Sequence, residues 1–295
     1  EHFADRLHAA CREKGAPVCV GLDPVFDRLP DELKQAGNEV QAIETFCHEV
    51  IDAVAPHVPC IKVQSACFER YRAPGFEAMF RVIEAARRPG LVVILDAKRG
   101  DIGLSASHYA AGLLEGAPGV DALTVHSYLG DDSLQPFIDV AARTGKGLFP
   151  LVRTSNPGGD GLQGLTLQDG RTVAEAVADM VTQLGAQAGC VSASGYSLLG
   201  AVVGATKPTE FVALRRQMWR QVFLVPGFGA QGGALESLRH CFHADGTGAL
   251  VSASRSVIFA YQDSADASWR DAVATAARDL HEQIAALLAS GAAEH

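Results

Sequence analysis

The chain has 295 residues, 48% hydrophobic and 20% charged, so it is long enough to bury a large core in one domain or in two smaller ones. Its net charge of −9 disfavours a protein that binds duplex nucleic acid, because such proteins depend on a broad basic face. No apolar run approaches the ~20 residues of a membrane span, and the polar N-terminus is unlike a secretion signal. Seven cysteines without a CxxC pair favour reduced thiols. We therefore expect a cytoplasmic protein that binds neither nucleic acid nor membranes.

Eight short apolar runs alternate with stretches of helical periodicity along the chain. Continuous hydrophobicity over four to six residues is typical of a parallel strand that is buried on both faces. The predicted strands are Val18–Leu22, Cys60–Val63, Leu91–Leu95, Ala122–Val125, Gly147–Val152, Leu199–Val203, Val222–Val225 and Ala249–Ser252. Between the first two, residues 43–54 place apolar side chains on one helical face, and residues 173–184 and 273–288 repeat this pattern.

Eight strand and helix units predict right-handed βαβ connections and a parallel sheet. We expect this sheet to close into one (β/α)8 TIM barrel domain that spans residues 1–295, with an open doubly wound sheet as the alternative. The segment Arg153–Gly170 is rich in Gly, Asn and Asp, which disfavours a helix, and it is too long for a routine connection. We predict that it forms a lid.

Charged side chains gather at the end of the third run, in the sequence DAKRGD. Alternation along a strand places Asp96 and Lys98 on the same side, and Gly100 lets the chain turn at Asp101. Lys62 lies inside the second run, where an unpaired ammonium would be very costly, and Asp23 follows the first run. These residues predict an array of ammonium and carboxylate groups at the C-terminal strand ends, where barrel enzymes have their active sites. An exposed turn with solvated charges is the alternative.

Glycines recur after the seventh run, in the sequence PGFGAQGG, and Arg255 follows the eighth run. In (β/α)8 enzymes the loops after these two strands frequently hold a phosphate. Gln231 can donate an amide N–H, and Arg255 can bind phosphate oxygens through two nitrogens. The pattern indicates a phosphate site, and an ordinary set of turns is the alternative.

The motif DxKxxD, formed by Asp96, Lys98 and Asp101, resembles that of the orotidine 5′-monophosphate decarboxylases. The segments TSNPGG, VVGAT and PGFGAQGG resemble the longer bacterial subfamily, and the likeness runs from Asp23 to Arg255. The resemblance implies a carboxy-lyase that converts orotidine 5′-monophosphate to uridine 5′-monophosphate, the last step of de novo pyrimidine biosynthesis, without a metal or another cofactor.

The resemblance also implies a role for each matching residue. Lys98 would stabilise and protonate the C6 carbanion, beside Lys62 and Asp96, and Asp23 would hold a ribose hydroxyl. Asp101 would reach across the interface of a homodimer to complete the partner's site. The other substrate contacts implied are Ile102 and Ser105 in the partner's site, Ser155 at the pyrimidine, and Pro226, Gln231, Ser254 and Arg255 at the phosphate. Ser105 stands where the family usually has Thr, Ser254 replaces a common Gly, and Leu104 replaces a small polar residue.

Three other functions remain open at this point. A Mg²⁺-dependent sugar-phosphate decarboxylase or synthase on the same barrel would need an additional acidic metal ligand, and no Glu-rich set is evident. An aldolase could form a Schiff base on Lys98 or Lys62. A noncatalytic nucleotide-binding protein would not need the whole charged array. His126 and Ser127, after the fourth run, are interpreted as structural residues.

Overall fold

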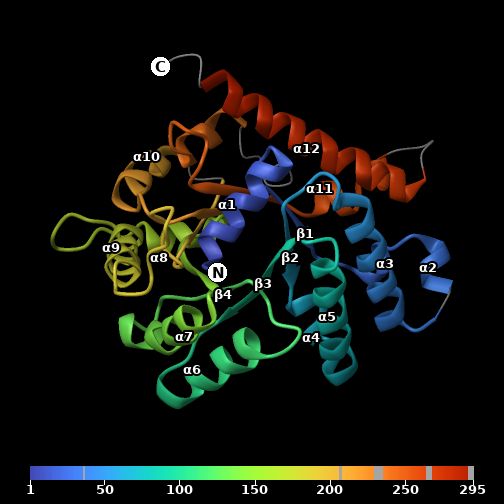
Figure 1. The fold of residues 1–295 in the computed structure, drawn as a ribbon, viewed down its shortest axis with the longest axis horizontal. Coiled ribbons are helices and arrows are strands. Elements are labelled where there is room, and N and C mark those ends of the chain that lie inside the picture. The colour runs from blue at the N-terminus through green and yellow to red at the C-terminus, as the bar shows by residue number, and fades with distance from the viewer. Residues whose placement is uncertain (36, 206–207, 229–234, 264–267, 292–295) are drawn as a thin grey trace.

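The computed structural model describes residues 1–295 except 36, 206–207, 229–234, 264–267 and 292–295. Eight parallel strands close into a barrel in sequence order, and helices surround it (Figure 1). The strands are β1 Val18–Leu22, β2 Cys60–Gln64, β3 Val92–Arg99, β4 Ala122–Val125, β5 Gly147–Arg153, β6 Ala201–Val203, β7 Phe223–Pro226 and β8 Ala249–Ala253. The prediction of a (β/α)8 barrel is therefore confirmed.

Helices of very different lengths connect the strands. The α-helices are α1 Phe3–Lys14, α2 Asp31–Gln35, α3 Glu39–Val54, α4 Ala66–Glu69, α5 Arg72–Arg87, α6 Gly103–Ala110, α7 Asp131–Thr144, α8 Asp160–Gln163, α9 Val173–Gly185, α10 Pro208–Gln217, α11 Arg255–Ile258 and α12 Trp269–Gly291. The 3₁₀ segments are η1 Phe26–Arg28, η3 Pro157–Gly159, η4 Leu235–Cys241 and η5 Ala260–Asp263, and η2 Ala111–Glu115 is a π-helix. The helical faces predicted within 43–54, 173–184 and 273–288 belong to α3, α9 and α12.

The side chains of each strand alternate between the barrel interior and the helices. Val18, Val20 and Leu22 of β1 join the core between the strands and the helices, whereas Cys19 points inward. The lower interior is apolar, with members from β1 to β8 that include Cys60, Ile94, Phe149 and Leu250. Two residues further along β2, β3 and β8, the inward positions are Lys62, Asp96 and Ser252, which line a cavity. The barrel interior is thus apolar toward the N-terminal ends of the strands and polar toward their C-terminal ends.

Helix α1 closes the N-terminal end of this barrel. Its Phe3 and Leu7 are buried in the same cluster as the inward strand residues. The ring of Phe3 meets the ring of Phe149 edge-on, with 5.8 Å between centroids. The barrel interior is therefore filled with side chains below its polar end.

Two strands differ from their predicted bounds by more than one residue at one end, and four others differ by a single residue at one or both ends. β3 continues to Arg99, because Asp96 still pairs with Gln64 of β2 and Arg99 pairs with Val125 of β4 across an irregularity in register. β6 begins at Ala201 rather than at Leu199, which forms only an isolated bridge. Charged residues can continue β3 because their backbone pairs with neighbouring strands and their side chains form ion pairs and hydrogen bonds. A prediction from hydrophobicity alone does not include these interactions.

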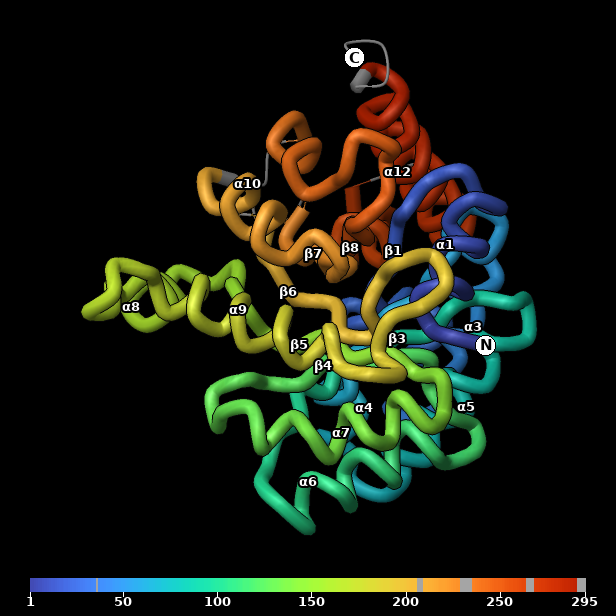
Figure 2. Tube along the Cα trace, turned by 60° about the vertical axis from the view of Figure 1, so that its left-hand side comes forward, coloured from blue at the N-terminus to red at the C-terminus, as the bar shows by residue number. Residues whose placement is uncertain are grey.

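The segment Arg153–Gly170 is not free of helix, so that part of its prediction is wrong. It contains η3, which begins at Pro157, and the single turn α8. Arg153 is buried and pairs with Asp160 of α8 and with Glu210 of α10, and Gln163 exchanges hydrogen bonds with Thr154. These side-chain contacts stabilise a short helical turn despite its glycines. In Figure 2 the α8 and α9 region projects from the side of the barrel.

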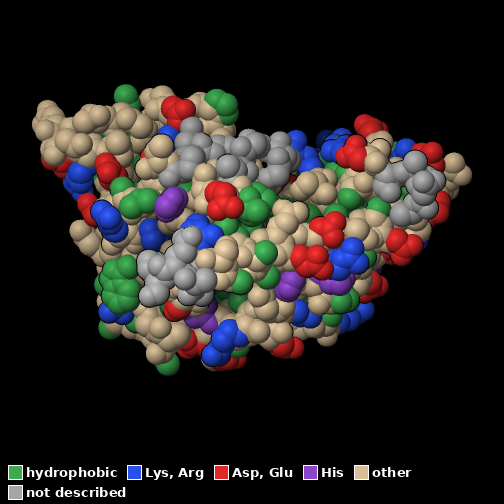
Figure 3. All heavy atoms as spheres, turned by 90° about the horizontal axis from the view of Figure 1, so that it is seen from above, with side chains coloured by type: hydrophobic (Ala, Val, Ile, Leu, Met, Phe, Trp, Pro, Cys, Tyr) green, Lys and Arg blue, Asp and Glu red, His purple; other side chains and the backbone are tan. Residues whose placement is uncertain are grey.

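The surface and the cysteines agree with the expectations from composition. Acidic and basic side chains are intermixed on the face in Figure 3, without a broad basic area among the described residues drawn there. Within the described ranges, no helix combines the length and the apolarity that a membrane crossing requires. All seven cysteines are free thiols, and five of them are buried.

Candidate active site

A cavity of ≈ 400 Å³ opens at the C-terminal ends of the strands. Lys62, Asp96 and Lys98 line one side, and Pro226 and Arg255 line another. This is the end of a (β/α)8 barrel at which active sites are found. Members of the predicted charged array and of the predicted phosphate site, which come from separate parts of the sequence, thus line one cavity.

Asp96 lies between two ammonium groups. Its Oδ2 accepts a hydrogen bond from Lys62 Nζ at 2.8 Å, and its Oδ1 accepts one from Lys98 Nζ at 2.6 Å. Lys62 Nζ also lies 3.7 Å from Asp23 Oδ1. Short contacts between ionised groups are strong in a site that excludes water. The array therefore contains two cations and two carboxylates, with Asp96 shared.

The charges in this array stabilise one another. Burial by itself would lower the pKa of Lys62, but the negative charges of Asp96 and Asp23 outweigh it and hold this pKa above its usual value. Burial would raise the pKa of Asp96, but Lys62 and Lys98 outweigh it and hold this pKa well below its usual value. Both groups stay ionised at neutral pH.

The backbone of Lys98 adopts a left-handed conformation with φ of 46°, which is rare for a residue other than glycine. Its N–H donates to Thr124 Oγ1 at 2.9 Å, and Thr124 Oγ1 in turn donates to Asp96 Oδ1 at 2.9 Å. The side chain of Lys98 is 48% exposed, whereas that of Lys62 is 5% exposed. Lys98 is therefore the cation of the array that a molecule in the cavity can reach.

Asp23 presents an oxygen that has no hydrogen-bond partner within the described part of the chain. This atom, Oδ1, is buried beside Lys62. Gly21, two residues earlier, has no room for a side chain, because a Cβ there would lie 1.9 Å from Ser254 Oγ. The close approach of β1 to Ser254 therefore brings Asp23 to the wall of the cavity, where its oxygen can accept a donor from a ligand.

The predicted phosphate residues lie on the wall formed after β7 and β8. Pro226, Gly227, Ser254 and Arg255 line the cavity, and Arg255 is exposed. Arg255 forms no ion pair with any other described residue. Gln231 lies outside the described residues. An unpaired guanidinium at the mouth of a cavity is suited to binding an anionic group.

Residues Thr154, Ser155 and Asn156 line the cavity at the start of the predicted lid. Ser155 lies against the end of β6, where the sequence has Gly204. A Cβ on Gly204 would lie 2.7 Å from the backbone of Ser155. This close approach requires glycine, and it explains the glycine in the sequence VVGAT.

Asp101, Ile102 and Ser105 do not line the cavity of their own chain. Asp101 Oδ1 accepts a hydrogen bond from the N–H of Ile102 at 2.8 Å, and Ile102 and Ser105 are exposed. The structure thus brings Lys62, Asp96 and Lys98 together without Asp101.

The sequence model of one family, described as "Orotidine 5′-phosphate decarboxylase / HUMPS family", matches residues 16–268. The chain belongs to this family. The resemblance inferred from Asp96, Lys98 and Asp101 is therefore confirmed.

Individual members of the orotidine 5′-phosphate decarboxylase / HUMPS family are similar over nearly the whole chain. A relative from Rhodopirellula baltica, named orotidine 5′-phosphate decarboxylase, is 45% identical, and the match covers 96% of this chain and 98% of the relative. One of the same name from Deinococcus radiodurans is 41% identical over 88% of this chain and 89% of the relative. The solved structure of Leishmania donovani OMP decarboxylase matches with a TM-score of 0.78 and 31% identity, over 98% and 99% of the two chains.

Several cavity residues of this family member were missed by sequence reasoning. Thr124 contacts both Asp96 and Lys98, and Gln64 Nε2 lies 3.3 Å from Asp96 Oδ2. Thr124 is a polar residue inside a predicted strand and Gln64 directly follows one, and that was the available signal. Phe228, which also lines the cavity, carried none.

His126 and Ser127 do not line the cavity, in agreement with the structural interpretation. The ring of His126 packs so closely on Gly100 that a Cβ there would lie 2.2 Å from it. Ser127 Oγ donates to the carbonyl of Leu151 at 3.1 Å.

Proposed function

We propose that this chain decarboxylates orotidine 5′-phosphate in the cavity between Lys98 and Arg255. The observation that carries the proposal is the pair of ammonium groups on Asp96. The more accessible one, Lys98, faces a cavity whose other wall holds Arg255, which forms no ion pair with another described residue. Family membership and the names of the relatives support the same substrate.

Lys98 supplies both charge and a proton. When the bond between C6 and the carboxylate breaks, CO₂ leaves without the bonding electron pair, which stays on C6 as a carbanion. The Lys98 ammonium stabilises this charge as it develops and then transfers a proton to C6. The products are CO₂ and uridine 5′-monophosphate, and Lys98 recovers its proton from water.

The other members of the array position and charge Lys98. Asp96 accepts hydrogen bonds from both ammonium groups, which fixes Lys98 Nζ in the cavity. Lys62 is buried and paired with Asp96, so it sets the orientation of that carboxylate. The carboxylate of Asp23, which lines the cavity and is 29% exposed, accepts a ribose hydroxyl.

The phosphate contributes binding energy at a distance from the reacting carbon. Arg255, Ser254, Pro226 and Gln231 hold it, and Ser155 contacts the pyrimidine. Binding at both ends draws the segment 153–170 over the substrate and excludes water from the charged array.

A homodimer completes the site in this proposal. Asp101 and Ile102 lie outside the cavity of their own chain, and Ile102, Leu104 and Tyr128 are exposed apolar side chains with relative accessibilities of 59%, 74% and 80%. Burial of these side chains against a second copy would bring Asp101 and Ser105 to the partner's substrate. We place the enzyme in the cytoplasm, where free thiols persist.

Mixing inactive variants tests the shared site. Lys98→Ala and Asp101→Ala subunits, each inactive alone, should regain activity when mixed, because one of the two sites in a hybrid dimer carries both native residues. A mixture that stays inactive, although hybrid dimers form, contradicts the shared site.

The decisive assay is the loss of orotidine 5′-phosphate absorbance by the purified chain. We expect Lys98→Ala to lose turnover by several orders of magnitude while still binding uridine 5′-monophosphate, and the surface variant Lys34→Ala to keep full turnover. Activity that survives EDTA separates this reaction from a Mg²⁺-dependent sugar-phosphate reaction. Near-normal turnover in Lys98→Ala would refute the assignment.

A further inference from the structure

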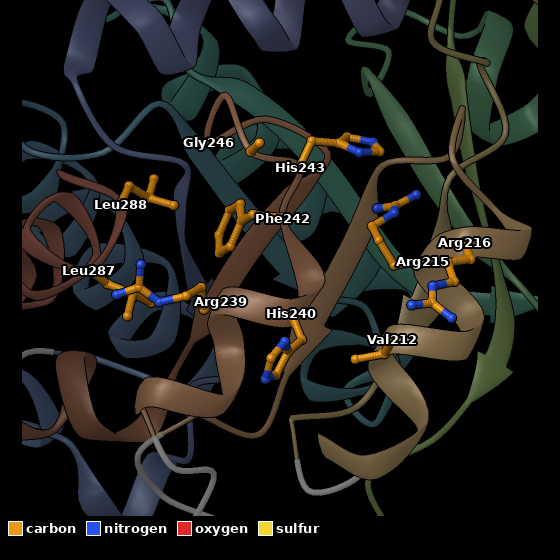
Figure 4. Close-up of a pocket in the computed structure, with 11 residues that line it drawn as sticks. Val212, Arg215, Arg216, Arg239, His240, Phe242, His243, Gly246, Leu287 and Leu288 are labelled. Carbon is orange, nitrogen blue, oxygen red and sulfur yellow. The ribbon is translucent and has the colours of Figure 1, made fainter. Parts of the chain in front are cut away.

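A second cavity, of ≈ 410 Å³, lies outside the active site and is basic. Arg215 and Arg216 reach it from α10, Arg239 and His240 from η4, and His243 from the chain that leads to β8 (Figure 4). None of the described residues that line it is an Asp or a Glu. The chain has a net charge of −9, yet five basic side chains and no acidic one line this cavity, so charge is unevenly distributed over the molecule.

This cavity lies at the opposite end of β7 and β8 from the active site. Arg215 donates from Nη2 to the carbonyl of Gln221 and from Nη1 to that of Gly248, residues that directly precede the two strands. Pro226 and Ser254, which line the active-site cavity, follow the same strands. The two cavities therefore share no described lining residue.

The three arginines are unpaired. None forms an ion pair with a carboxylate within 4.0 Å among the described residues. Elsewhere in the described chain, arginines usually have such a partner: Arg6, Arg81, Arg87, Arg88, Arg99, Arg143, Arg153, Arg171, Arg270 and Arg278. Other arginines, among them Arg255, also form no ion pair with a described residue, so the feature of this cavity is that three such guanidinium groups lie together.

Carbonyl groups and the ring of Phe223, whose centroid lies 3.8 Å from Cζ, surround the guanidinium of Arg215, and no carboxylate of the described residues pairs with it. Arg215 is 7% exposed, its Nη atoms donate only to neutral carbonyls, and its Nε has no partner among the described residues. Burial lowers its pKa to about 10, so it stays charged at neutral pH. A buried cation without a counter-ion is costly. Arg239 Nη1 is likewise buried without a partner among the described residues.

We propose that this cavity binds a small, multiply charged phosphate compound. The guanidinium groups of Arg216 and Arg239 match phosphate oxygens in geometry, and the charge of the structural Arg215 beside them favours a ligand with more than one negative charge. The volume lies within the usual range for small-molecule sites. Phe242, Leu287 and Leu288 form an apolar wall that can contact an organic group attached to the phosphate. An extended nucleic acid would need a basic surface well beyond this cavity.

Calorimetric titration of the full chain with pyrophosphate tests the proposal. In one experiment, saturating uridine 5′-monophosphate occupies the active site. In a parallel experiment the Arg255→Ala variant is titrated, because this substitution removes the cation that binds anions in the active-site cavity, whether or not the proposed function is correct. We expect pyrophosphate to bind one further site per chain in both experiments. Titrations with inorganic phosphate and with ADP then distinguish free phosphates from organic ones, because an apolar contact favours ADP over pyrophosphate.

The matched variants are two double substitutions of equal charge. Arg216→Gln with Arg239→Gln removes two cations from the cavity but leaves the structural Arg215, and we expect pyrophosphate affinity to fall about tenfold or more. Arg72→Gln with Arg88→Gln makes the same charge change at the first residue of α5 and at the residue after its end, away from the cavity, and should alter the affinity by less than about threefold. Unchanged turnover in both variants shows that they are folded. No binding of pyrophosphate beyond the active site, or equal losses in the two variants, overturns the proposal.

Discussion

Replacing Thr124 by Val tests whether the backbone of Lys98 and the carboxylate of Asp96 are positioned together. Thr124 is 1% exposed and connects the two through hydrogen bonds of 2.9 Å each. Val has nearly the same shape but no hydroxyl, so it leaves the N–H of Lys98 without its acceptor and Asp96 without one donor. A buried polar group without a partner costs about 1–3 kcal/mol, and a hydrogen bond to a charged group contributes about 1.5–3 kcal/mol. The left-handed conformation of Lys98 itself costs about 1–3 kcal/mol, which the bond to Thr124 helps to offset.

These contributions overlap, so we expect a combined effect of about 2–4 kcal/mol on the transition state, or about 30-fold to 1,000-fold in kcat. Thr124→Ser keeps the hydroxyl and should stay within about fivefold of the native kcat. The assay is the initial rate of orotidine 5′-phosphate loss, with the affinity for uridine 5′-monophosphate measured on the same samples. Since Thr124 positions Lys98 rather than binding the nucleotide, this affinity should change little. The reasoning is refuted if Val retains native kcat, or if Ser and Val are equally impaired.

Three further predictions concern the two ends of the cavity and the acidity of the array. Arg255→Ala should weaken binding of uridine 5′-monophosphate about 100-fold but that of uridine less than about twofold, and calorimetry showing equal losses would contradict a phosphate role. Gly204→Ala should lower kcat about tenfold or more, because its Cβ would displace the backbone of Ser155, and an unchanged kcat would contradict this. Asp96→Asn should have a lower free energy of unfolding than the native chain at pH 7. Urea unfolding should show that this difference in free energy is smaller by about 1 kcal/mol at pH 3. The sign follows from the folded-state pKa of Asp96, which lies below its unfolded value of about 3.9, so its stabilisation is complete above that value and declines as the pH falls below it. If the difference in the free energy of unfolding between the two chains does not change with pH, the structure does not hold Asp96 in its ionised form.

The barrel could be predicted because its strands are buried on both faces and therefore have continuous apolar sequences. The same logic located Lys62, since a charge inside such a run must have a partner, and Asp96 directly follows the next run along the chain. The extension of β3 to Arg99 could not be predicted, because it depends on pairing with β2 and β4 rather than on hydrophobicity. The turn α8 was missed for a similar reason, since its contacts with Arg153 join residues that have no recognisable local pattern.

The role of Thr124 was also beyond the sequence. Nothing in the run ALTV indicates that one hydroxyl contacts both the backbone of Lys98 and the side chain of Asp96. The left-handed conformation of Lys98 is equally invisible, because local propensity favours glycine there. These features arise from the closing of the barrel, which brings β3 and β4 into register.

Helix α1 covers the N-terminal end of the described barrel, opposite the cavity that contains Lys98. Phe3 and Leu7 fill its lower end, and the apolar layer above them offers no chain of polar groups along which a proton could travel. In the proposed reaction, the proton that Lys98 gives up would then be replaced from the same side by which the nucleotide and CO₂ leave. A new cycle would begin only after the product has left and water has reached Lys98 again.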